Sequence, residues 1–169
     1  MPSEKKRIKF TVYKFSPSFS TGSFDCGSEP YNTFIVSEAL DYQKRNLGVT
    51  YVFLHEETLA GYVTISMGSL NKQKLPDDPV GRKPRYIPAL FLGRLARDNK
   101  YKGLSVGDQL LDWVLTKAKK LSKQLGCRLV LLESEERARS TYERSGFILI
   151  PPSRRDPRNI MFFDLGENK

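Results

Sequence analysis

The chain has few residues that bind metals or form disulfides. Among its 169 residues are two cysteines, Cys26 and Cys127, and one histidine, His55. A structural zinc site takes about four Cys or His ligands, so we expect no metal site in this protein. The two cysteines lie far apart in the sequence and form no Cys-x-x-Cys pair, which favours a reducing, cytoplasmic setting over a disulfide framework.

The sequence also lacks long apolar segments. No run approaches the ~20 apolar residues that a membrane-spanning helix needs. The first residues, 1–9, are largely charged and contain no apolar core of a secretory signal peptide. We therefore expect neither membrane insertion nor secretion.

The composition is that of an ordinary globular protein. Hydrophobic residues make up 39% of the chain and charged residues 28%, which argues against disorder and against a fibrous class. A chain of this length can bury a single core without disulfides or a metal. We therefore expect one domain over residues 1–169.

Acidic residues are outnumbered by basic ones. Lys and Arg total 28 and Asp and Glu 19, which gives a net charge of +9. The excess predicts attraction to a polyanion such as nucleic acid, an acidic protein face or a phosphorylated cofactor, although charge that only keeps the protein soluble explains it equally well. Few aromatic residues lie within the basic clusters, so contacts with phosphate are favoured over stacking of bases.

Strand-like and helix-like segments alternate along the chain. Alternating or continuous apolar runs predict strands at 8–13, 50–54, 61–66, 87–96, 128–132, 147–150 and 160–165. Apolar residues at helical spacing predict helices at 29–47, 106–125 and 135–145, with Ser28 capping the first and Gly126 ending the second. Helices between strands indicate a mixed sheet with helices on its faces, in which the segment 87–132 forms a parallel crossover.

Two stretches fall outside these elements. Residues 71–85 contain three prolines and many charges and are expected to form a surface loop. Residues 97–107 connect a buried strand to the start of a long helix through a glycine-containing turn. Such a turn directs backbone N–H groups outward at the positive end of the helix dipole, where an anion binds. Physical reasoning alone favours an ordinary helix start here, since the turn matches neither the Walker A motif nor the dinucleotide fingerprint.

This turn resembles a known cofactor motif. Residues 93–98 and 101–111 resemble the acetyl-CoA motif of the GNAT superfamily of N-acetyltransferases, (Gln/Arg)-x-x-Gly-x-(Gly/Ala), whose backbone amides hold the pyrophosphate. Lys102 takes the first place of the motif and Gly107 the last, while Ser105 replaces the middle glycine. If that place requires a positive φ, Ser105 weakens the binding. The resemblance implies that acetyl-CoA is bound by Leu95, Ala96, Arg97, Lys102, Gly103, Leu104, Ser105, Val106, Gly107 and Asp108.

Three further stretches resemble one branch of this superfamily. They are Phe24-Asp25-Cys26-Gly27, the strand 91–96, and the segment 138–147, in which Thr141 stands where the branch usually has Phe. The branch contains the acetyltransferase toxins of toxin–antitoxin pairs, which acetylate the amino group of aminoacyl-tRNA. The resemblance implies an α/β (α+β) GNAT fold, with a mixed, mostly antiparallel sheet of six to seven strands, flanking helices and a splayed central parallel pair. It also implies charged tRNA as a partner, an antitoxin protein and a homodimer.

Tyr142 is the candidate catalytic residue. The resemblance places it where the family has a general acid beside the sulfur of CoA. A phenol has a pKa of ~10, so it is protonated at neutral pH and can donate a proton to the departing thiolate. The alternative is that Tyr142 packs in the core and its hydroxyl only finds a hydrogen-bond partner.

Other residues are candidates for contact with the acceptor. Arg94 interrupts an apolar strand, so it either touches substrate or forms a structural ion pair. Glu133 follows a buried strand and could accept a proton through water, or it is simply solvated. Arg154 and Arg155 lie in a basic loop that would meet a charged RNA end, or they too are only solvated.

No strong catalytic base is evident in the sequence. His55 is expected to be a packed or surface histidine, and Cys26 a small buried residue and not a nucleophile. An α-amino group has a pKa of ~8 and needs less help from a base than a lysine side chain at ~10.4. The missing base therefore favours an α-amine as acceptor. The backbone of Leu95–Arg97 is the expected donor to the oxyanion.

The predicted function is acetyl transfer from acetyl-CoA to the α-amino group of aminoacyl-tRNA, which would block translation. Two alternatives stay open. One is a housekeeping GNAT enzyme that acetylates a small-molecule or protein amine. The other is a GNAT-like module that binds CoA or RNA without catalysis, which the departures at Ser105 and Thr141 keep open.

Overall fold

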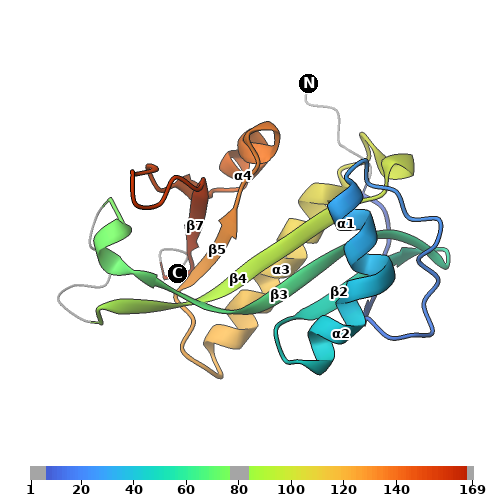
Figure 1. Cartoon of the computed structure of the whole chain (residues 1–169), viewed down its shortest axis with the longest axis horizontal. Helices are drawn as coiled ribbons and strands as arrows, with labels where there is room; N and C mark the ends of the chain where they lie inside the picture. Colours follow the sequence, from blue (N-terminus) through green and yellow to red (C-terminus); the bar gives the residue numbers. More distant parts are fainter. Residues whose placement is uncertain (1–6, 77–83, 167–169) are drawn as a thin grey trace. The chain divides into compact units, whose positions relative to one another are not determined.

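The computed structural model describes residues 7–76 and 84–166. Its seven strands form one mixed sheet in the order β1-β2-β3-β4-β5-β7-β6, with helices beside it (Figure 1). The chain divides into two compact units: Met1–Ser66 with Arg94–Val114, and Met67–Gly93 with Leu115–Lys169. The predicted fold class is confirmed, whereas the expectation of a single domain stays a prediction. No helix within the described ranges is long and apolar enough to cross a membrane.

An antiparallel meander forms the sheet of the first unit. Its strands are β1 (Thr11–Lys14), β2 (Val49–His55) and the first part of β3 (Thr58–Asn71). Glu56 and Glu57 form the turn between β2 and β3 with φ of 49° and 68°. Two successive positive φ values match the primed turns that suit the twist of a hairpin. The predicted hairpin is therefore confirmed, with β3 running further than the sequence pattern indicated.

Helices cover both faces of this meander. On one face lies a continuous helical segment made of α1 (Glu29–Thr33), the π turn η1 (Phe34–Glu38) and α2 (Ala39–Lys44). Phe34 of this segment stacks on Tyr62 at 6.1 Å between ring centroids. On the other face Trp113 contacts Tyr51 and Phe53 at 4.7 and 5.4 Å. The alternation of side chains along β2 and β3 therefore buries both sides of the meander. The predicted cap is wrong in detail, because the Ser28 side chain makes no capping hydrogen bond.

The long helix α3 (Val106–Ser122) has the predicted apolar stripe, but it ends earlier than expected. Val106, Leu110, Leu111 and Val114 are buried, whereas Leu125 is 53% exposed. The carbonyl of Leu121 accepts from the backbone N–H groups of both Gln124 and Leu125 at 2.9 Å. This tight last turn closes the helix before Gly126, so the predicted extension to residue 125 is wrong.

The second unit is built on a parallel pair of strands. In it β4 (Tyr86–Arg97) pairs with β5 (Leu129–Glu133) from Ala89 and Leu129 to Leu92 and Leu132. The antiparallel strands β7 (Ile160–Asp164) and β6 (Ile148–Leu149) continue the sheet. The predicted parallel crossover and the closing pair of strands are confirmed.

Short turns complete the chain. The helix α4 (Arg139–Arg144) follows the 3₁₀ turn η4 (Glu136–Ala138), and the 3₁₀ turn η3 (Asn99–Tyr101) precedes α3. The predicted loop 71–85 begins with the 3₁₀ turn η2 (Lys72–Lys74), and its residues 77–83 lie outside the described part of the chain. The aliphatic core of the second unit is formed by Leu70, Leu75, Ile87, Ala89, Leu129, Leu131, Ile150 and Phe162.

Candidate functional site

The turn before α3, in the first unit, has an unusual backbone. Asp98 caps η3 by accepting the N–H of Lys100 at 2.9 Å, and the N–H of Lys102 then bonds to the carbonyl of Asn99 at 3.1 Å. Gly103 and Ser105 follow with φ of 80° and 59°. Such conformations direct successive N–H groups toward one side and form an anion-binding concavity.

The first turn of α3 leaves its donors open. The N–H groups of Val106, Gly107 and Asp108 donate to no acceptor in the ranges 7–76 and 84–166, as expected for a helix start. A Cβ atom built on Gly103 or Gly107 would meet nothing within 4 Å. Gly107 is therefore not required by packing of the protein itself, although Ala would suit a helix better. Open amides beside a space without side chains fit the pyrophosphate of acetyl-CoA.

Ser105 occupies the place where the family motif has its middle glycine. Its φ of 59° shows that this place does require the left-handed region, which costs a residue with a Cβ about 1–2 kcal/mol. The Ser105 carbonyl accepts the N–H of Gln109 at 3.1 Å and starts the helix. Its hydroxyl is buried and has no hydrogen-bond partner among the described residues. The substitution thus strains the turn without adding an internal hydrogen bond.

The segment Phe24–Gly27 fastens the start of the helical segment to this turn. The N–H of Asp25 donates to Asp98 at 3.0 Å, and the N–H of Asn99 donates to the Asp25 carbonyl at 2.9 Å. The Asp25 carboxylate accepts the N–H of Gly27 and the side-chain amide of Asn32, and these bonds hold its pKa below the ordinary value. The motif therefore serves as a latch on the anion-binding turn.

The latch explains a buried charge that sequence reasoning missed. Asp98 is only 3% exposed, and its two carboxylate oxygens are both used by backbone N–H groups. Gly27 has φ of 82°, and a Cβ there would approach the Asn99 side chain at 3.4 Å. The signal was in the sequence, because Asp98 directly follows the motif strand and Asp25 and Gly27 form a typical turn pair.

Arg94 lies on β4 against the helical segment. Its guanidinium carbon is 3.6 Å from the ring centroid of Phe34 and 5.7 Å from that of Tyr42. Neither of the two expected alternatives, an ion pair or a solvent-facing charge, describes this contact, since the charge rests on aromatic faces. Stacking fixes the plane of the guanidinium and leaves its N–H edges for another acceptor.

Tyr142 lies in the second unit on α4. The side chain is half-buried, and its ring meets Phe147 edge to face at 5.9 Å. The Tyr142 carbonyl accepts the N–H groups of Ser145 and Phe147, and Gly146 between them has φ of 95°. This helix end fixes the direction of the Tyr142 ring. The ring packs on one side only, so the expected alternative of a fully buried core tyrosine is not what the structure holds.

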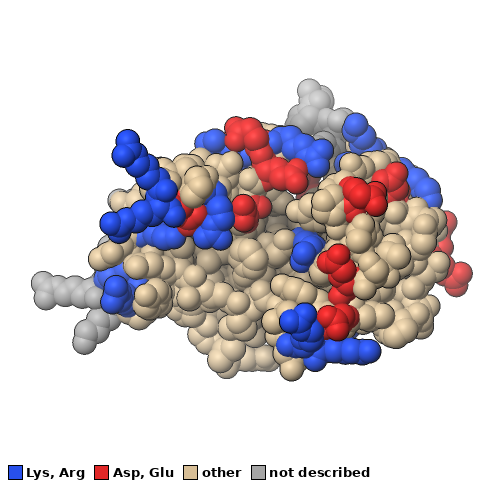
Figure 2. Space-filling view, in the orientation of Figure 1, with Lys and Arg blue, Asp and Glu red and all other residues tan. Residues whose placement is uncertain are grey.

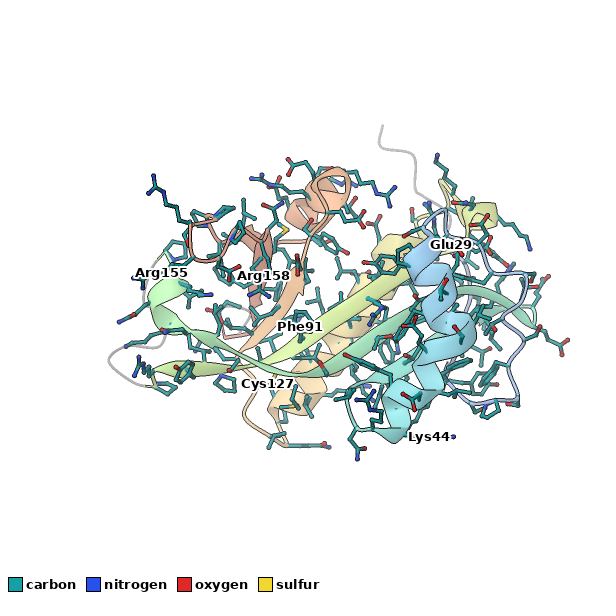
Figure 3. All side chains as sticks on the ribbon, in the orientation of Figure 1. Glu29, Lys44, Phe91, Cys127, Arg155 and Arg158 are labelled. Atoms are coloured by element: carbon teal, nitrogen blue, oxygen red, sulfur yellow. The ribbon has the colours of Figure 1, made fainter. Side chains whose placement is uncertain are left out.

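The remaining acceptor candidates also belong to the second unit. Glu133 ends β5 as an exposed residue opposite Ile160 of β7. Arg154 and Arg155 are exposed on the loop between β6 and β7 and form no ion pair within the described part of the chain. Arg155 is labelled on this loop in Figure 3. Lys and Arg side chains gather over the loop in Figure 2.

No nucleophile or strong base is assembled around the other candidates. His55 packs edge to face on Tyr101, with its Nδ1 3.4 Å from the phenol oxygen. Cys26 is half-buried beside the carbonyl of Ser28, and burial raises the pKa of the Cys127 thiol. These placements agree with the packing roles expected for them.

A family comparison gives the chain its place. The model of the acetyltransferase (GNAT) family matches residues 16–147. The chain belongs to this family. The fold and the predicted acetyl-CoA-dependent N-acetyltransferase activity are thereby confirmed at the level of the family.

Individual relatives are more specific. The tRNA-acetylating toxin of Mycobacterium tuberculosis (strain ATCC 25618 / H37Rv) is 23% identical over 149 residues, which cover 88% of each chain. The solved structure of AtaT complexed with acetyl-methionyl-tRNAfMet has a TM-score of 0.85 at 22% identity and covers 94% of this chain and 96% of that one. The crystal structure of AtaTR bound with AcCoA has a TM-score of 0.78 at 24% identity and covers 94% and 95%. At these identities the two solved structures establish the shared fold.

Proposed function

We propose that this protein transfers acetyl from acetyl-CoA to the α-amino group of an aminoacyl-tRNA. An acetylated amine cannot attack a peptidyl ester, so the product would stop translation. The observation that carries the proposal is the relative named a tRNA-acetylating toxin, which this chain matches over 88% of both lengths. The match extends across both compact units, so it is not limited to the part that would hold acetyl-CoA.

The distribution of charge supports a large anionic acceptor. The described residues of the first unit contain nine basic and nine acidic side chains, and those of the second contain fourteen and six. The net charge of the described chain thus lies entirely in the second unit, at +8. A small amine needs no such excess, whereas RNA is attracted by clustered Lys and Arg side chains.

The proposed roles divide between cofactor and chemistry. The anion-binding turn, from Lys102 to Asp108 with Leu95–Arg97 of β4 before it, binds acetyl-CoA, which supplies the thioester. Backbone N–H groups of Leu95–Arg97 stabilise the oxyanion that forms as the amine attacks. Tyr142 donates its phenolic proton to the departing thiolate sulfur.

Four side chains are proposed to contact the acceptor. Arg94 presents its stacked guanidinium to a carbonyl or phosphate oxygen, and Glu133 takes up the proton of the amine through water. Arg154 and Arg155 meet RNA phosphates as mobile, unpaired cations. We further propose a homodimer in the cytoplasm and an antitoxin partner, the latter because a relative of the same fold is recorded as the AtaTR complex.

The test is transfer of labelled acetyl from acetyl-CoA into a charged tRNA pool. Free amino acids, a polyamine and a lysine peptide are assayed in parallel. We expect label in the charged tRNA that is lost on deacylation. Label only in a small amine or peptide would contradict the proposal and favour a housekeeping enzyme. Bound acetyl-CoA without any transfer would instead favour a module that has no catalytic activity.

A further inference from the structure

A pocket of about 390 Å³ opens in the second unit beside the loop between β6 and β7. One wall comes from the η2 turn and the other from the loop and the start of β7. Its lining consists of Gln73, Lys74, Pro76, Ile150, Pro151, Ser153, Asp156, Arg158 and Ile160. None of these residues belongs to the acetyl-CoA motif, so the pocket needs its own explanation.

A single carboxylate holds two cations on the wall of this pocket. Asp156 accepts Lys74 Nζ at 2.8 Å, and Arg158 Nε and Nη2 at 2.8 and 2.9 Å. Arg158 is the larger cause and Lys74 the next of the lowered pKa of Asp156, so this carboxylate stays charged at neutral pH. The cluster therefore keeps a net charge of +1 in a fixed place.

The two cations keep donors for an outside acceptor. Lys74 has two further N–H groups, and Arg158 retains Nη1 and one N–H of Nη2. Their side chains are 45% and 55% exposed, whereas Asp156 is only 18% exposed. An incoming anion thus meets the positive groups first, and the negative charge lies behind them.

The floor of the pocket has a different character. Ile150, Pro151 and Ile160 give it an apolar surface, and Gln73 and Ser153 add a side-chain amide and a hydroxyl. This combination suits one nucleotide: a phosphate against the cations, a ribose or base face on the apolar floor, and a base edge toward the amide. The volume lies near the lower end of the range for small-ligand sites, roughly 300–1,000 Å³, which limits the occupant to a group of about that size.

We propose that this pocket receives one nucleotide of the RNA acceptor and so positions the RNA on the basic unit. The inference rests on the proposed function for the identity of the RNA, and on the charge of the pocket for the mode of binding. RNA is favoured over an acidic peptide because the exposed rim adds Arg154 and Arg155, which suit a repeating phosphate backbone.

The experiment measures affinity for deacylated tRNA by fluorescence anisotropy at several salt concentrations. Two pocket variants, Gln73→Glu and Lys74→Gln, are each compared with a matched control, Gln124→Glu and Lys123→Gln. The controls make the same change of charge in the same unit, at exposed residues that do not line the pocket. Acetyl-CoA affinity is measured on all four variants as a check of folding.

We expect each pocket variant to weaken tRNA binding at least fivefold more than its control, with acetyl-CoA affinity unchanged. Equal weakening in pocket variants and controls would overturn the proposal, because only total charge would then matter. Loss of binding to poly-glutamate, with tRNA binding unchanged, would also overturn it and make the pocket a protein-binding site. If the pocket variants lose tRNA affinity but the wild-type chain acetylates no charged tRNA, the pocket proposal stands and the proposed function fails.

Discussion

The two compact units of this chain differ in charge, in core and in the chemistry that they contain. The first unit has no net charge over its described residues, an aromatic core around Phe34 and Tyr62, and the open amides before α3. The second has a net charge of +8, a mainly aliphatic core, and Tyr142. The comparison shows that the basic excess does not lie in the unit whose amides would bind the anionic cofactor. Backbone N–H groups can hold a pyrophosphate without lysines, so the excess charge is left for a second polyanion.

The largest effect is expected from a single hydroxyl in the second unit. Tyr142→Phe keeps the ring and its contact with Phe147 but removes the proton donor. General acid catalysis contributes about 10²–10⁴-fold, and the turnover number should fall by that factor for every acceptor. Acetyl-CoA affinity, measured by calorimetry, should stay at the wild-type value. Undiminished acetylation by this variant would show that Tyr142 is not the acid.

Gly107→Val separates cofactor binding from folding in the first unit. The new side chain meets no protein atom, so the thermal unfolding temperature should change little. It fills the space beside the first amides of α3, and losing one or two charge-assisted hydrogen bonds of ~1.5–3 kcal/mol each should weaken acetyl-CoA at least tenfold. Calorimetric titration with acetyl-CoA measures the loss. An unchanged affinity would place the pyrophosphate elsewhere.

The basic loop of the second unit gives a smaller effect with a distinct signature. In Arg154→Gln/Arg155→Gln the loss of two phosphate contacts should lower tRNA affinity about tenfold and reduce the slope of log affinity against log salt by roughly 1.4–1.8. Filter binding across a salt series measures both quantities. Acetyl-CoA affinity serves as the control, because it should not respond. An unchanged slope would mean that these arginines only keep the protein soluble.

Comparison of sequence with structure explains which features could be predicted. The strands, the apolar stripe of α3 and the anion-binding turn follow from local patterns, and the structure contains all of them. The stacking of Arg94 on Phe34 could not be predicted, because it depends on how β4 meets a helical segment distant in the sequence. The π turn at Phe34–Glu38 was also missed, since one extra residue in a turn changes an apolar pattern too little to be seen.

The pocket beside η2 was missed for a related reason. Arg158 and Lys74 each read as part of an ordinary basic cluster in the sequence. Only folding brings both to Asp156, which is 82 residues from Lys74. Ion pairs between distant segments leave no periodic pattern, so the sequence showed the charge without its arrangement.

The smallest effect tests whether the departure from the family motif has a cost. Ser105→Gly removes the Cβ from a residue with φ of 59° and removes a buried hydroxyl that has no partner in the described ranges. Relief of the left-handed strain is worth about 1–2 kcal/mol, and the greater freedom of glycine in the unfolded chain offsets part of it. The free energy of unfolding should therefore rise by about 1 kcal/mol, as measured by urea denaturation. If the serine also holds the amides away from their best positions, acetyl-CoA should bind up to fivefold more tightly. A loss of affinity in this variant would instead mean that the hydroxyl turns outward and donates to the cofactor, which would make Ser105 a ligand of this particular chain.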